Sequence, residues 1–268
     1  MKKPWREVDF STRNMDNLKN KLINFNSPNQ GIPANILLLG RSGHGKSSLI
    51  NTCQSAISDR FRSHAVTALS AGSSRTQHFL KYQLTSFQNQ KETPINVNIM
   101  DTIGWEPQTF TLEMFHKILN SQIEDKQSFS DKTKITSEPR NKVHCVAYVA
   151  DLNTFLNMEF DDLKILKTFG KYARQKMNIN TFVIITKVDV CLPEGTSISD
   201  IYKVKNIETR MKKICSALEC DEKFVFPMIN YRDCMNVNTN INILALSLMS
   251  ALVDAASDFI YNNKDSSK

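Results

Sequence analysis

The segment from Gly40 to Ser47, GRSGHGKS, constrains this chain more than any other, because it matches the pattern GxxxxGK[ST]. An apolar run, NILLLG, precedes it, and a helical pattern follows it. In that context such a loop folds its backbone N–H groups around phosphate oxygens. Lys46 is expected to meet the β- and γ-phosphates, and the Ser47 hydroxyl to bind Mg²⁺. The candidate phosphate-binding residues are Gly40, Ser42, Gly43, His44, Gly45, Lys46, Ser47 and Ser48. A glycine-rich turn without a ligand is the alternative.

Short apolar runs alternate with helical patterns along the chain. The predicted strands cover residues 35–40, 78–87, 95–101, 143–151, 181–189 and 224–230. The predicted helices cover residues 46–58, 109–126, 160–172, 199–218 and 240–262. This alternation predicts an α/β fold, with a mainly parallel, doubly wound six-stranded sheet and helices on both faces. No helix separates the second and third strands, so we expect them to pair antiparallel. Pro227 places the last strand near an edge.

A second motif, DTIG, lies at the end of the third predicted strand and comprises Asp101 to Gly104. The Asp101 carboxylate can hold a metal ion through water, and the Gly104 amide can reach a γ-phosphate. Alone, this motif is weak evidence, because aspartate and glycine often form turns at strand ends. Its position after the phosphate-binding loop favours the functional interpretation.

A third motif, TKVD, ends the strand predicted at residues 181–189 and contains Thr186, Lys187 and Asp189. An aspartate at this point can accept hydrogen bonds from the N1–H and the exocyclic amine of guanine. Adenine has an acceptor where guanine has N1–H, so the same carboxylate rejects adenine. The three motifs together predict a guanine-nucleotide site, and a small-molecule kinase using ATP is disfavoured.

A threonine between the first helix and the second strand is needed to contact Mg²⁺ and the γ-phosphate. The options are Thr67 and Thr76, and Thr76 has the better position, just before the strand. We therefore predict Ser47, Thr76 and Asp101 as the metal-binding set. Lys46, Ser47, Thr76 and Gly104 are the residues predicted to act on the γ-phosphate.

The order and spacing of the three motifs resemble the GTP-binding G domain, which implies a Ras-like fold. In that family a fourth element contacts the base near the last strand, and here Ile229-Asn230-Tyr231 takes its place. This string departs from the common Ser-Ala-Lys pattern. It resembles the asparagine-containing variant of dynamin-like and immunity-related GTPases, which assigns Asn230 to the base pocket.

Longer strings resemble the interferon-induced protein 44 family: PWREVDF, NILLLGRSGHGKSSLIN, KVHCVAYVAD, VIITKVD and FPMINYRD. The resemblance covers nearly the whole chain. It implies a cytoplasmic, interferon-linked, antiviral protein that binds GTP or GDP with Mg²⁺. A scaffold in innate immunity that nucleotide stabilises, without hydrolysis, is the alternative.

Trp105 follows the DTIG motif, where Ras-type GTPases carry a glutamine that orients water. An indole N–H donates but cannot accept, so Trp105 cannot take over that task. Arg41, His44, Arg75 or a group from a second subunit are the candidates to replace it. We therefore expect slow hydrolysis that rises if a nucleotide-dependent homodimer forms.

The charge composition limits the classes of partner that this chain is expected to bind. The chain has 34 Lys+Arg and 27 Asp+Glu, so its formal charge is +7. The basic residues are dispersed and lack interleaved aromatics, which makes nucleic acid an unlikely partner. We expect no signal peptide and no transmembrane segment, because carboxylates interrupt the apolar run at residues 241–261.

One G domain at residues 35–264, with a helical lead-in at 1–34, is the predicted organisation. The polar segment at 127–142 is a candidate insertion, and protein partners are unidentified.

Overall fold

The computed structural model describes residues 3–29, 31–63, 65, 79–102, 104, 110–123, 139–157, 160–232 and 236–263. At its centre is a six-stranded sheet with the order β2-β3-β1-β4-β5-β6. The strands are β1 Ala34–Leu39, β2 Leu80–Gln88, β3 Lys91–Asp101, β4 Cys145–Asp151, β5 Asn180–Thr186 and β6 Val225–Pro227. All neighbours pair parallel except β2 and β3, which form the predicted antiparallel hairpin. Pro227 lies in β6 at the sheet edge, as predicted, where a residue without an N–H is tolerated.

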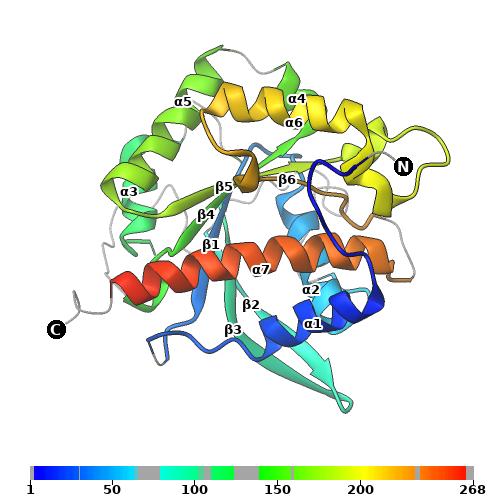
Figure 1. Cartoon of the computed structure of the whole chain (residues 1–268). Coiled ribbons are helices and arrows are strands. Elements are labelled where there is room, and N and C mark those ends of the chain that lie inside the picture. Colours follow the sequence, from blue (N-terminus) through cyan, green and yellow to red (C-terminus); the bar gives the residue numbers. More distant parts are fainter. Residues whose placement is uncertain are drawn as a thin grey trace.

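Helices cover both faces of the sheet, as the alternating pattern predicts (Figure 1). The α-helices are α1 Thr12–Ile23, α2 Lys46–Ser58, α3 Leu112–Leu119, α4 Leu152–Leu156, α5 Phe160–Lys171, α6 Lys205–Leu218 and α7 Thr239–Asn262. Short helical segments are Pro139–Asn141, Val188–Cys191, Ile198–Lys203 and Glu222–Phe224, with a π-helix at Tyr172–Lys176. In Figure 1, α1, α2 and α7 lie on one side of the sheet, and α3, α5 and α6 lie on the other.

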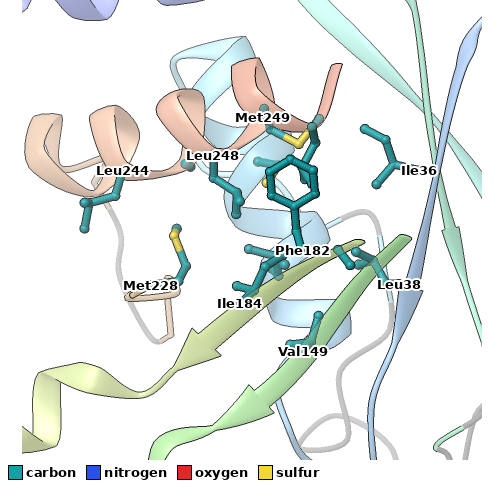
Figure 2. Close-up of a cluster of buried hydrophobic side chains, with 14 of the residues drawn as sticks. Ile36, Leu38, Val149, Phe182, Ile184, Met228, Leu244, Leu248 and Met249 are labelled. Carbon is teal, nitrogen blue, oxygen red and sulfur yellow. The ribbon is translucent and has the colours of Figure 1, made fainter. Parts of the chain in front are cut away.

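The main core lies between the sheet and α7. Phe182 and Ile184 of β5 point toward Leu248 and Met249 of α7, and Figure 2 shows this layer. Burying each such side chain contributes about 1.5–3 kcal/mol. Within the described ranges, α7 is the one helix long and apolar enough to span a membrane, but 72% of its apolar stretch is buried inside the protein. Its packing in the core therefore accounts for this hydrophobicity.

The lead-in at the N-terminus packs on this same layer. Helix α1 lies along α7, and Lys21 donates to Ser250 at 2.8 Å and to Asp254 at 2.7 Å. Before α1, the chain crosses to the segment Ile198–Lys203, where the Trp5 amide donates to the carbonyl of Tyr202 at 3.0 Å. The division into residues 1–34 and 35–264 remains a prediction.

Two predicted helices differ from the observed ones. Residues 199–218 are not one helix, because a 3-10 segment ends at Lys203 and α6 begins at Lys205. The Tyr202 carbonyl, which a continuous helix would use, accepts from Trp5 instead. The helix predicted at 109–126 ends at Leu119, where the Asn120 side chain donates to the His116 carbonyl at 2.9 Å.

Candidate nucleotide site

The conformation of the loop between β1 and α2 depends on its glycines. Gly43 and Gly45 have φ values of +77° and +89°, a left-handed region that favours glycine. A Cβ at Gly40 would lie 2.1 Å from the carbonyl oxygen of Val149, so only glycine fits there. Helix α2 begins at Lys46, and Ser47 and Ser48 lie in its first turn. The positive end of the helix dipole and its free amides therefore lie at the loop, as an anion site requires.

Lys46 lies at the centre of this loop. Its Nζ donates to the carbonyl of Gly40 at 2.8 Å and to that of Arg41 at 3.4 Å. The side chain is buried, and this burial lowers the pKa of the ammonium group, while nearby Asp101 opposes the shift. A buried cation whose partners are backbone carbonyls is suited to an incoming phosphate.

The end of β3 supplies the candidate metal ligands. Ser47 Oγ donates to Asp101 Oδ2 at 3.3 Å, and Asp101 is only 1% exposed. Its other oxygen, Oδ1, is buried without a hydrogen-bond partner among the described residues. Burial raises the pKa of Asp101 to about 6, although Lys46 and Ser47 lower it. A hydroxyl and a carboxylate, both hard oxygen ligands, fit Mg²⁺.

This burial predicts a pH-dependent effect of Asp101→Asn on the nucleotide-free protein. Because the pKa of Asp101 is raised from 3.8 to about 6, its stabilising contribution is complete below about pH 4 and is lost as the pH rises through 6. The variant should therefore unfold roughly 6–12 °C higher than the wild type at pH 8, corresponding to about 3 kcal/mol. At pH 4 the two proteins should have the same unfolding temperature.

Thermal unfolding at both pH values measures this difference. Adding Mg²⁺ and GDP at pH 8 supplies the second measurement, since the wild type should then gain more stability than the variant. An Asp101→Asn protein that melts below the wild type at pH 8 without nucleotide would contradict the interpretation of Asp101 as a carboxylate whose buried charge destabilises the fold.

Gly104 lies against the same loop. A Cβ on Gly104 would lie 2.6 Å from the backbone nitrogen of Ser42, and Thr102 Oγ1 donates to the Leu38 carbonyl at 3.1 Å. Gly104 therefore lies directly against the loop at Ser42, and the Thr102 side chain ties the start of the motif to β1. This close approach fits the role predicted for the Gly104 amide, which remains a prediction.

The end of β5 holds the loop from the other side. Thr186 Oγ1 donates to the carbonyl of His44 at 2.8 Å, and Lys187 Nζ donates to that of Gly43 at 3.1 Å. Lys187 also forms an ion pair with Asp151 at 3.3 Å. The motif therefore fixes the loop through two of its side chains. Their direct contact with a ligand remains a prediction.

Of the two residues predicted to read the base, Asn230 contacts the loop, and Asp189 lies in the turn that follows β5. Lys187 takes a left-handed conformation with φ +57°, which ends β5 and begins the turn that carries Asp189. Asp189 forms an ion pair with Arg232 at 3.4 Å. Asn230 Nδ2 donates to the carbonyl of Gly45 at 3.1 Å, and its buried Oδ1 has no partner in the described part of the chain. A ligand donor can satisfy that oxygen.

His44 is buried within the loop. Burial lowers its pKa to about 4, although the carboxylate of Asp151 raises it. The imidazole is therefore neutral at pH 7, so His44 does not supply a cation to a phosphate. A neutral imidazole cannot stabilise negative charge on a phosphate as an arginine does, so His44 is a weaker candidate than Arg41 or Arg75 for the missing catalytic group.

Most of the predicted site residues meet at the carboxyl ends of β1, β3 and β5, beside the point where the strand order reverses. Thr67, Thr76, Arg75 and Trp105 lie outside the described residues. The sequence patterns do not single out two charged residues at the site: Asp151, which pairs with Lys187, and Arg232, which pairs with Asp189. The position of Asp151 at the end of an apolar strand is a signal for the first. Arg232 follows Asn230 closely but carries no pattern of its own.

Comparison with known proteins agrees with this geometry. The Septin family model matches residues 30–231, about three quarters of the chain. Interferon-induced protein 44-like of Homo sapiens is 25% identical over 238 residues, covering 84% of this chain and 52% of that protein. Interferon-induced protein 44 of Mus musculus is 23% identical over 240 residues, covering 84% and 55%. The chain thus spans about half the length of the curated relatives it matches.

Among solved structures, a dimerization-deficient mutant of Toc33 from Arabidopsis thaliana has a TM-score of 0.51. It is 16% identical, and the match covers 94% of each chain. At this identity the likeness shows the fold alone, and that fold is the Ras-like α/β G domain. The chain belongs to the septin family of G-domain proteins and is related to interferon-induced protein 44.

Proposed function

We propose that this protein binds GTP and GDP with Mg²⁺. The observation that carries the proposal is the arrangement of Lys46 and Ser47 within one loop, with Asp101 bonded to Ser47 beside it. Asp189 lies in the short helical segment after β5, directly behind Thr186 and Lys187, whose side chains hold the same loop. Phosphate, metal and guanine each have a chemically suited partner in this arrangement. The buried oxygens of Asp101 and Asn230, which lack partners among the described residues, are the atoms that ligands would satisfy.

Titration with fluorescent GDP, ADP and XDP, each with Mg²⁺ and with EDTA, tests the proposal. We expect GDP to bind at least about 100-fold more tightly than ADP, because a mispaired base leaves the Asp189 carboxylate without its donors. In a parallel titration with fluorescent GTP, chelation of Mg²⁺ should weaken binding more than it does for GDP. Equal affinity for GDP and ADP would refute the guanine assignment.

We propose that hydrolysis is slow in the monomer and that a second copy of the chain accelerates it. Trp105 cannot orient water, and neutral His44 supplies no cation. Toc33, which shares this fold, was crystallised as a dimerization-deficient mutant, and this supports a homodimer as the second-copy arrangement.

A concentration series measures this directly. The turnover per molecule should rise by at least about tenfold as the protein concentration passes the dimer dissociation constant, because an arginine donated in trans accelerates phosphoryl transfer strongly. Sedimentation at the same concentrations gives the dimer fraction. Fast turnover that does not change with concentration contradicts this part of the proposal.

The relatives suggest where this activity operates. We propose a cytoplasmic protein that interferon induces and that contributes to antiviral defence, with protein partners that depend on the bound nucleotide. The names of the human and mouse relatives support the link to interferon. Because Trp105 permits weak hydrolysis, a nucleotide-stabilised scaffold is the second candidate. Transcript levels in cells with and without interferon test the induction.

A further inference from the structure

The C-terminal end of α6 brings two cysteines together. Glu219 adopts the left-handed conformation, with φ +53° and ψ +49°. The Cys220 amide donates to the Cys215 carbonyl at 3.1 Å, and the Glu219 amide to the Ser216 carbonyl at 3.4 Å. This pair of bonds is the Schellman motif, in which the side chains at the first and last of the bonded positions meet. Those positions are Cys215 and Cys220.

The two thiols differ in environment. Both thiols are free, but Cys215 is buried at 7% exposure, whereas Cys220 is half-buried. The neighbouring Cys215 thiol lowers the pKa of Cys220, and the Arg174 cation acts in the same direction, while burial and the Asp221 carboxylate oppose them. The pKa of Cys215 is raised, first by Cys220 and then by burial. The outer sulfur is therefore the nucleophile of the pair.

Cys220 also lines a surface cavity that carries cations. Arg174 and Lys167 line the same cavity, together with the hydroxyl-bearing Tyr148 and Thr181. Arg174 is fixed in place, because its Nη1 donates to Thr181 Oγ1 at 2.5 Å. The cavity itself is too small for a reagent, but it places the Arg174 cation beside the half-buried Cys220 sulfur, where it stabilises a thiolate.

We propose that Cys220 is a site of thiol–disulfide exchange with glutathione disulfide, and that Cys215 resolves the adduct. The Cys220 thiolate attacks one sulfur of glutathione disulfide, forms a mixed disulfide and releases glutathione thiolate. Cys215 then loses its proton, attacks the Cys220 sulfur and displaces the second glutathione thiolate. The net products are a Cys215–Cys220 disulfide and two reduced glutathione molecules, so the protein is oxidised as the reagent is reduced. Lys167 already pairs with Glu219 at 2.9 Å, so Arg174 is the cation that assists attack by the Cys220 sulfur.

Intact-mass spectrometry and peptide mapping of the full chain test the proposal. The reduced protein is mixed with glutathione disulfide, and the wild type should show a transient adduct on Cys220 followed by loss of two hydrogens. Cys215→Ser should keep the adduct on Cys220, and Cys220→Ser should lose both products. Arg174→Gln should slow adduct formation several-fold at pH 7, because the thiolate loses its cation.

Cys191 provides the matched control, since it is the other half-buried cysteine among the described residues. Cys191→Ser should react like the wild type, and Cys220 should form its adduct at least about tenfold faster than Cys191. Equal labelling of the two cysteines, or loss of two hydrogens in Cys220→Ser, would overturn the proposal. Circular dichroism of each variant separates a failure to react from a failure to fold.

Discussion

Lys46→Ala should weaken the binding of GDP and GTP by about 100-fold or more, corresponding to about 3 kcal/mol. The Lys46 ammonium is buried in the loop, and within the described residues it donates to the carbonyls of Gly40 and Arg41. Charge-assisted bonds to the phosphates contribute about 1.5–3 kcal/mol each, and the variant lacks them. Fluorescent-nucleotide titration measures the loss.

The fold should survive this change, because the alanine removes no hydrophobic contact of the core and relieves the burial of a cation. Lys212→Ala is the matched control, since Lys212 lies on the exposed face of α6 and pairs with Glu208. It should bind nucleotide like the wild type. A Lys46→Ala protein that is folded and still binds GTP with wild-type affinity would contradict the phosphate assignment. If it loses nucleotide but keeps its protein partners, the scaffold role gains support.

Asp189→Asn should exchange the base specificity. We expect GTP affinity to fall by roughly 100- to 1,000-fold, because the amide cannot accept both guanine donors and presents its own N–H to one of them. Xanthine carries an oxygen where guanine has its amine, so XTP should bind more tightly to the variant than GTP does. Parallel titrations with GTP, XTP and ATP measure the exchange.

Arg232→Ala is the control for this substitution. It removes the ion pair at 3.4 Å but keeps the carboxylate, so the preference for guanine should remain. The pair is half exposed and contributes about 0.2–1 kcal/mol, which limits the change in affinity to about fivefold. If Asp189→Asn preferred GTP over XTP as strongly as the wild type does, the base would not bind at Asp189.

The sequence predicted the parts of the site that depend on local pattern. Helix α2 begins and ends at the predicted residues, Lys46 and Ser58, and the loop before it has the glycine conformations that its spacing requires. The antiparallel pairing of β2 and β3 follows from the absence of a helix between them. These features are set by residues close together in the chain.

Contacts between distant segments could not be predicted in the same way. The end of the 3-10 segment before α6 depends on Trp5, which lies near the start of the chain and takes the Tyr202 carbonyl. The role of Thr186 in holding His44, and the pairing of Arg232 with Asp189, likewise require the folded sheet to bring two loops together. Periodicity says which side chains are buried but not which loops meet.

A crystal structure of the protein with Mg²⁺ and a non-hydrolysable GTP analogue tests the central claim most directly. We predict the β- and γ-phosphates against Lys46 and the amides of the loop, Mg²⁺ on Ser47, and guanine paired with Asp189. An analogue bound anywhere else, or guanine turned away from Asp189 while the phosphates occupy the loop, would contradict the account.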